Sequence, residues 1–246
     1  MAPYGIQPMT GLEWALGLAA LAIGGALHGS MGFGMGLVAA PLLVLINPEL
    51  IPGPMLCAGV ILTLMITVRD RSSADLRGVK WLLLGRVPGM VLGALAVMWL
   101  STTGLAVVFA CAILSLVTVS VAGVSLPRTN PALFGAGAMS GLMGTTIGVG
   151  GPPLTLVYQR SSGREIRGTL APIQSFGATT SLGALALVGE FGLADLGRGL
   201  VLAPGMAIGF AVSGWVAPRL RPAVIRPAVL VFAAASAVAI LVRTLM

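Results

Sequence analysis

The chain has 246 residues, of which 57% are hydrophobic and only 9% are charged. A soluble domain has a charged fraction of about 25%, so this composition excludes an ordinary soluble protein. The net charge of +7 comes from 14 basic and 7 acidic residues, and the basic residues lie in short clusters between apolar segments. Such clusters set the orientation of a membrane protein. We therefore expect the lipid bilayer, and no nucleic acid, as the partner of this chain.

Apolar segments follow one another along the whole chain. A helix needs about 20 apolar residues to cross a bilayer. Several stretches approach this length, namely Thr10–Leu27, Pro54–Val68, Val79–Leu100, Thr103–Leu126, Thr169–Val188, Gly199–Val216 and Ala228–Leu241. None alternates strictly between apolar and polar residues, as a strand of a membrane β-barrel would. We expect an all-α polytopic membrane protein, whose first segment is retained because no basic n-region of a signal peptide precedes it.

The same run of glycines and prolines interrupts two of these segments, at residues 25–42 and 137–154. Moving the first run onto the second superimposes identical residues at Gly25, Ala26, Gly29, Met31, Gly32, Gly36, Pro41 and Leu42. Paired segments of this kind in the two halves of a transporter indicate its binding site. The reason is that unwound backbone inside a bilayer needs protein or a polar cavity around it.

A later element repeats in the same order, because the sequence PGMVLG at Pro88–Gly93 matches PGMAIG at Pro204–Gly209. We expect two transmembrane repeats in one membrane domain, residues 1–126 and 127–246, with the boundary at the loop-like segment Pro127–Pro131. Each repeat would contain a Gly/Pro-broken helical hairpin and three transmembrane helices. The expected segments are 12–46, 54–69, 80–100 and 103–125, then 131–158, 168–188, 198–217 and 227–245.

The second broken segment is too short for two comfortable crossings. Pro131–Leu142 and Thr145–Tyr158 each fall short of the required length, so a re-entrant hairpin of two half-helices that turns near the midplane is expected. Two short crossing helices are the alternative. Either way each half makes an odd number of crossings, and the two repeats are therefore expected to be inverted relative to each other.

Four basic clusters predict the orientation of the chain. They lie at residues 69–80, at Arg128, at 160–167 and at 219–226. Placing all four on the cytoplasmic side satisfies the positive-inside rule. The remaining short loops, with Glu49, Glu190, Asp195 and Arg198, then lie outside, and both termini are expected on the non-cytoplasmic side.

The two broken motifs supply the candidate substrate-binding residues. Glycines allow the backbone to bend or to approach a ligand closely, and the N-terminus of a half-helix offers N–H groups and a partial positive charge to a small anion. Hydroxyl groups at the same depth add donors. The candidates are Ser30, Gly32, Phe33, Gly34 and Gly36 in the first motif, and Thr145, Thr146, Gly148, Gly150, Gly151 and Pro152 in the second. Close packing of helices through small residues is the alternative interpretation.

Three further polar residues fall within or beside apolar segments. Arg86 is either the counter-charge of an anionic substrate or a side chain that reaches back to the cytoplasmic interface. Gln174 either contacts substrate or hydrogen-bonds a neighbouring helix. His28, the only histidine, is either a hydrogen-bonded core residue or a proton-coupling group.

Several of these features resemble the TauE/SafE-type sulfite exporter family. The resemblance covers essentially the whole chain and is carried by Gly141–Pro153 (GLMGTTIGVGGPP), by its counterpart at Gly29–Pro41, by Arg164–Thr169 and by the Pro-Gly-Met elements. It implies a permease of the bacterial inner membrane for small sulfur-containing anions such as sulfite, sulfonates or sulfoacetate.

The sequence therefore favours a secondary transporter for a small anion, working by alternating access. A passive anion channel is the first alternative, and a membrane scaffold or enzyme is the second. No Walker motif or catalytic constellation is present, so we expect no enzyme activity and no cofactor. Cys57 and Cys111 lack metal-ligand spacing, so no metal site is expected. A coupling proton or ion and a homodimer are left open as further partners.

Overall fold

The computed structural model describes residues 9–32, 35–123, 126–158, 160–216, 219 and 222–245. Within these ranges the chain forms helices and turns, which agrees with the all-α prediction. The helices are α1 (Gly11–Met31), α2 (Met35–Ile46), α3 (Gly53–Asp70), α4 (Leu76–Trp99), α5 (Thr102–Val121), α6 (Asn130–Ile147), α7 (Gly151–Tyr158), α8 (Gly163–Leu187), α9 (Leu193–Val216) and α10 (Pro222–Leu245), with short 3₁₀ turns η1 (Pro48–Leu50) and η2 (Arg71–Ser73).

Polar caps explain where the long helices begin. A hydroxyl or carboxylate oxygen at the N-cap accepts a hydrogen bond from a backbone N–H of the first turn. The caps are Thr10 for α1, Asp75 for α4, Ser101 for α5, Thr129 for α6 and Ser162 for α8. Thr10 and Glu13 form a full capping box. These caps lie at the ends of the apolar segments, where a polar side chain costs little.

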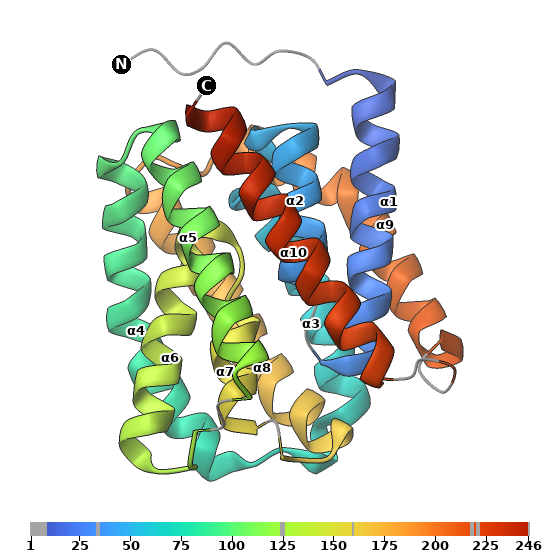
Figure 1. The fold of residues 1–246 in the computed structure, drawn as a ribbon, viewed down its shortest axis with the longest axis vertical. Coiled ribbons are helices and arrows are strands. Elements are labelled where there is room, and N and C mark those ends of the chain that lie inside the picture. Colours follow the sequence, from blue (N-terminus) through green and yellow to red (C-terminus); the bar gives the residue numbers. More distant parts are fainter. Residues whose placement is uncertain are drawn as a thin grey trace.

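Two pairs of helices are packed backbone to backbone. Helix α4 runs along α6, and α1 runs along α9 (Figure 1). A side chain at Gly89 would collide with the carbonyl oxygen of Ala138, and one at Gly209 would collide with that of Ala22. Both glycines belong to the repeated Pro-Gly-Met elements. These elements therefore provide the close helix contacts on which membrane proteins depend.

The two broken segments enter the bundle from opposite ends. In Figure 1, α1 begins and α2 ends at the upper end, whereas α6 begins and α7 ends at the lower end. At the lower end, the hydroxyl of Tyr158 donates a 2.7 Å hydrogen bond to Asp75, and the N–H of Leu126 donates to the carbonyl of Leu156. The α6–α7 pair therefore returns to the face from which it starts.

The break in the second segment lies later than expected. The prediction of two half-helices separated between Leu142 and Thr145 is wrong, because α6 continues without interruption to Ile147. The hydroxyl of Thr146 bonds the carbonyl of Leu142 within the helix, and the first left-handed glycine is Gly148, with φ of 74°. In the first segment, the 21 residues of α1 likewise form one helix, which ends at Gly32 with φ of 80°.

Among the residues that the structure describes, six helical stretches are long and apolar enough to cross a membrane, namely Gly11–Met31, Gly53–Ser73, Leu76–Trp99, Thr103–Val121, Leu193–Val216 and Pro227–Thr244. Helix α8 was also expected to cross and is not among them. It carries buried polar residues such as Gln174 and Ser181, and it packs against α3 and α4. Its polarity is explained by neighbours that are protein rather than lipid.

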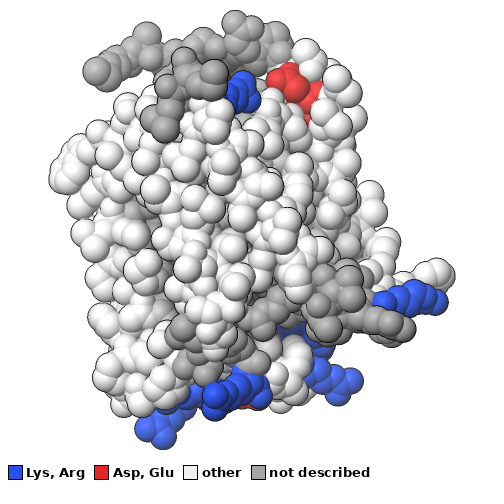
Figure 2. Space-filling model, in the orientation of Figure 1, with Lys and Arg blue, Asp and Glu red and all other residues white. Residues whose placement is uncertain are grey.

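Apart from Arg86, the charged residues of the described chain lie at the two ends of the bundle. Figure 2 shows Lys and Arg gathered at the lower end, with a broad uncharged band above them on the visible face. The lower end carries Arg69, Arg128 and Arg167, each in a described ion pair. At the upper end Arg198 pairs with Glu49 at 2.6 Å. This distribution is that of a protein surrounded by hydrocarbon at its middle.

Candidate functional site

Arg86 lies inside the bundle, in the middle third of α4. Only 3% of its surface is exposed, so the side chain does not reach an interface with water. Its Nη1 donates a 2.5 Å hydrogen bond to Oγ of Ser140 on α6. Its Nε is buried and has no hydrogen-bond partner among the residues that the structure describes. A guanidinium with an unused donor in this place can bind an acceptor that the chain itself does not supply.

Three glycines from three helical segments make room for this guanidinium. A Cβ atom at Gly144 would lie 2.9 Å from Nη2 of Arg86, and one at Gly150 would lie 3.2 Å from Nη1. A Cβ at Gly177 of α8 would collide with Nε. A side chain at Gly144 or Gly177 would displace the guanidinium, whereas one at Gly150 would press first on the carbonyl oxygen of Ser140, 2.9 Å from the Cβ position.

A small cavity lies beside Arg86, with a volume of about 30 Å³. It has room for about two water-sized groups. Its lining includes Gly144, Gly148 and Gly150 of the second motif together with Arg86 and Gln174, and it is completed by Met35, Leu56, Gly59, Thr63 and Ala178. The structure therefore brings four of the predicted binding residues together at one place, namely Arg86, Gly148, Gly150 and Gln174.

Gln174 supplies a second unused donor to this cavity. Its side chain is 9% exposed, and its Nε2 has no hydrogen-bond partner within the described part of the chain. A Cβ at Gly151 would lie 3.6 Å from its Oε1, so the amide lies against the start of α7. The alternative interpretation, in which Gln174 hydrogen-bonds a neighbouring helix, would require a partner for this nitrogen, and the described residues supply none.

The positive charge of Arg86 has no acidic partner. The chain has seven acidic residues, and all of them lie in loops or at helix ends, namely Glu13, Glu49, Asp70, Asp75, Glu165, Glu190 and Asp195. None lines the cavity. An isolated charge within a low-dielectric interior costs several kcal/mol. The site therefore favours binding an anion.

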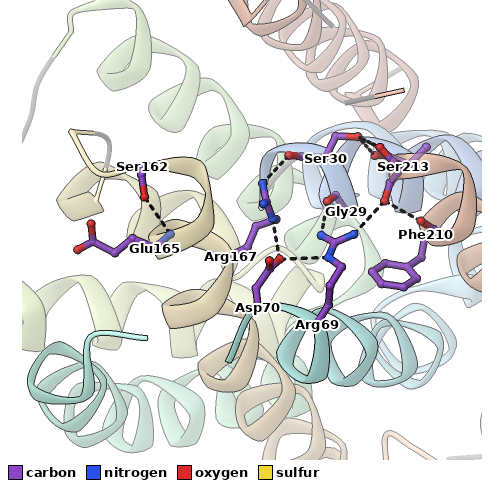
Figure 3. Close-up of polar contacts among 10 residues, drawn as sticks. Gly29, Ser30, Arg69, Asp70, Ser162, Glu165, Arg167, Phe210 and Ser213 are labelled. Carbon is purple, nitrogen blue, oxygen red and sulfur yellow. Dashed lines mark hydrogen bonds and ion pairs between the residues drawn. The ribbon is translucent and has the colours of Figure 1, made fainter. Parts of the chain in front are cut away.

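The end of the first motif takes part in a different cluster at the lower end of the bundle (Figure 3). Arg69 Nη2 donates to the carbonyl of Gly29 at 2.6 Å, and Arg167 Nη1 donates to that of Ser30 at 3.0 Å. Both arginines also bond Oδ2 of Asp70, at 3.2 and 2.8 Å. We call Arg69, Asp70 and Arg167 the Asp70 cluster. It satisfies the last carbonyls of α1 with positive charge, as the helix dipole favours.

Ser30 and Gly32 consequently lie apart from Arg86. The hydroxyl of Ser30 donates to the carbonyls of Ala26 at 2.7 Å and Ser213 at 3.2 Å. Gly32 lies against Ile166 and Arg167, with its Cβ position 3.0 Å from both side chains. Phe33 and Gly34 lie outside the described residues. Neither Ser30 nor Gly32 lines the central cavity.

The two motifs do meet, at Gly36 and Val149. A Cβ at Gly36 would lie 2.6 Å from Cγ1 of Val149, so the start of α2 is packed against the turn that precedes α7. Met35, the neighbour of Gly36, lines the Arg86 cavity. The two broken segments therefore approach each other within the bundle at these residues.

The remaining residues of the second motif have mainly structural contacts. Thr145 Oγ1 is 2.6 Å from Oγ of Ser181, and the hydroxyl of Thr146 bonds within its own helix. Pro152 faces a groove at the lower end rather than the cavity. Pro152 and Pro153 have no N–H, so the start of α7 offers an anion fewer donors than the sequence interpretation assumed.

His28 is buried in the first motif, with 3% of its surface exposed. It follows Gly24, whose Cβ position faces Ala39 of α2 at 2.8 Å, by one helical turn, so it lies on the same side of α1. Its Nδ1 has no hydrogen-bond partner in the described ranges. His28 does not line the Arg86 cavity, and its proton-coupling role stays a prediction.

Two larger grooves lie toward opposite ends of the bundle. The lower groove, of about 350 Å³, is lined by the end of α1, by α7 and by parts of α2, α5, α8 and α10, including Ser30, Pro152 and Ile166. The upper groove, of about 430 Å³, is lined by the end of α6, by α2, α5 and α10 and by the start of α3, including Thr146 and Arg243.

Sequence reasoning missed three residues that lie against Arg86, namely Ser140, Gly144 and Gly177. Ser140 holds Arg86 and also donates a 2.6 Å hydrogen bond to the carbonyl of Gly150. Its alignment with His28 in the repeated motif could have drawn attention to it. Gly177 belongs to no motif, because its importance comes only from the crossing of α8 over the Arg86 side chain.

The sequence matches a known protein family. Residues 16–240 match the family described as Sulfite exporter TauE/SafE. The chain belongs to the TauE/SafE family. It is a multi-pass membrane transporter and not an enzyme, and the family implies a small anionic substrate. No curated protein and no solved structure gave a match.

Proposed function

We propose that this TauE/SafE protein is a secondary transporter of small sulfur-containing oxyanions such as sulfite or a sulfonate, and that the Arg86 cavity is its substrate site. The observation that carries the proposal is the buried guanidinium of Arg86, which has an unused Nε and no acidic partner. A bidentate guanidinium matches the geometry of an oxyanion. Gln174 Nε2 provides a second donor at the same cavity.

The shape of the cavity supports a compact substrate. Its volume of about 30 Å³ has room for about two water-sized groups, and the glycines of the second motif form one wall. Sulfite, a sulfur atom with three oxygens, is a compact anion of the kind that such a cavity favours. A long organic tail would need the lining to move aside.

We propose that the two halves of the chain are inverted repeats, residues 1–126 and 127–246. The packing supports this pairing. Helix α4 of the first half packs on α6 of the second half, and their counterparts, α9 of the second half and α1 of the first half, also pack on each other. The grooves support it as well. Leu156 lines the lower groove, and Val44, which aligns with it when the first motif is moved onto the second, lines the upper groove.

Alternating access would expose the cavity first to one groove and then to the other. The Asp70 cluster joins α1, α3 and α8 at the lower end, and we assign it the role of a contact that holds this end closed. The basic clusters support a cytoplasmic position for the lower end. We accordingly propose a location in the bacterial inner membrane, with both termini on the periplasmic side.

Flux measurements in proteoliposomes test this function. A transporter should give saturable uptake of labelled sulfite, and unlabelled sulfite on the opposite side should accelerate the exchange. A passive anion channel, the alternative for this architecture, should give flux that rises without saturation and that is not accelerated by counter-substrate. A protein without solute flux for any small sulfur anion would contradict the proposal.

A further inference from the structure

The central cavity carries one formal charge, and this charge has a consequence for the substrate. Among the residues that line the cavity, Arg86 is the only ionised one, and the others are Gln174, Thr63, glycines and apolar side chains. We infer that the anion carried through this cavity has a single negative charge. For sulfite this is hydrogensulfite, and for organosulfur substrates it is a simple sulfonate. The inference rests on the proposed function.

Charge balance is the reason. A monoanion beside Arg86 leaves the loaded cavity neutral, whereas a dianion leaves one uncompensated negative charge inside the membrane, which is strongly unfavourable. Only neutral donors are available to share that second charge, chiefly the amide of Gln174. The start of α7 adds few, because Pro152 and Pro153 have no N–H.

Arg69 and Arg167, the basic residues of the Asp70 cluster, are already occupied. They bond Asp70 and the carbonyls at the end of α1. Neither lines the cavity. Either of them would therefore have to leave an existing ion pair to serve as the second cation of a dianion.

Proton transfer within the cavity cannot change the charge of the substrate. The groups that face Arg86 are Ser140 and Gly144 from α6, Gly150 before α7, Gly177 and Gln174 from α8 and Thr63 from α3. None of them titrates near neutral pH. The single histidine, His28, is not in the lining. Hydrogensulfite must therefore be formed in the water on either side of the membrane. The dependence of sulfite transport on pH should then follow the protonation of sulfite and not that of a protein side chain.

The test uses purified full-length protein in proteoliposomes, with protein-free liposomes to subtract passive permeation. Initial uptake is measured at a fixed, subsaturating total concentration of sulfite, methanesulfonate, sulfoacetate or sulfate. The pH is varied equally on both sides, from mildly acidic to mildly alkaline, across the range in which hydrogensulfite loses its proton. Methanesulfonate is a monoanion throughout this range, so it reports any titration of the protein itself.

We expect sulfite uptake to fall in proportion to the hydrogensulfite fraction, methanesulfonate uptake to stay constant, and the dianions sulfate and sulfoacetate to be taken up poorly. The same profile is expected for His28→Gln. Sulfite uptake that rises with the dianion fraction, a methanesulfonate profile that falls in parallel with that of sulfite, or efficient sulfate uptake would overturn the inference and leave the proposed function standing. Failure of all four anions to move would overturn both.

Discussion

Oγ of Ser140 accepts a 2.5 Å hydrogen bond from Nη1 of Arg86 and donates one of 2.6 Å to the carbonyl of Gly150. A single hydroxyl thus links the buried charge of α4 to the glycine turn that precedes α7. Because Arg86 forms no ion pair, this bond is the main polar contact that fixes its guanidinium.

Replacing Ser140 by alanine should weaken substrate binding. A hydrogen bond to a charged group contributes about 1.5–3 kcal/mol, which corresponds to a loss of affinity of roughly ten- to hundredfold. Substrate titrations in proteoliposomes measure this loss. Ser115→Ala is the matched control, because Ser115 is exposed on α5 and bonds only the carbonyl of Cys111. Equal affinity in the two variants would contradict the positioning role of Ser140.

The position of the Arg86 guanidinium should depend on the absence of a side chain at Gly177. A methyl group there collides with Nε of Arg86, whereas a Cβ at Gly183 on the same helix has no atom within 4 Å. We expect Gly177→Ala to reduce transport severely and Gly183→Ala to retain it, with similar amounts of both proteins in the membrane. Normal transport by Gly177→Ala would show that the guanidinium can lie elsewhere.

Asp70 should stabilise the lower end of the bundle. Its carboxylate is buried and bonds both Arg69 and Arg167, and removing one partner of a buried ion pair costs about 3–5 kcal/mol. Asp70→Asn should therefore lower the melting temperature in detergent clearly. Glu165→Gln is the control, because the Arg128–Glu165 pair is partly exposed and contributes at most about 1 kcal/mol. Similar melting temperatures for the two variants would argue against the Asp70 cluster as a structural lock.

The orientation can be checked with single cysteines. In a variant without Cys57 and Cys111, a cysteine at Ser72 or Ser162 should react with an impermeant reagent only from the cytoplasm. A cysteine at Glu190 should react only from the periplasm, because it lies at the opposite end of α8. Labelling of position 190 from the same side as position 72 would contradict the orientation given by the basic clusters.

The sequence predicted the helical membrane fold, the two broken segments and the polar residues around the second one. It did not locate the breaks, because one glycine in such a run resembles the next. Only the packing shows that α6 continues to Ile147 and that Gly148 adopts the left-handed conformation. It also could not decide between the cavity and the interface for Arg86. That choice depends on Ser140 and Gly177, which come near the side chain only through the crossing of α4, α6 and α8.

In the first motif, the sequence predicted binding residues that the structure places away from the cavity. Ser30 and Gly32 have the composition of a binding loop, yet they lie at the Asp70 cluster. The equivalence of the two motifs in sequence therefore does not extend to their surroundings. The charged partners Arg69, Asp70 and Arg167 come from helix ends that the sequence interpretation treated only as orientation signals.

Substrate titrations of Arg86→Gln and Arg86→Lys test whether Arg86 binds the transported anion. Arg77→Gln is the control, because Arg77 is exposed at the start of the same helix. We expect Arg86→Gln to raise the apparent substrate constant at least about tenfold, equivalent to about 1.4 kcal/mol. Arg86→Lys should recover only part of this loss, because lysine lacks the bidentate guanidinium, and Arg77→Gln should transport normally. An unchanged substrate constant in correctly inserted Arg86→Gln protein would contradict the account.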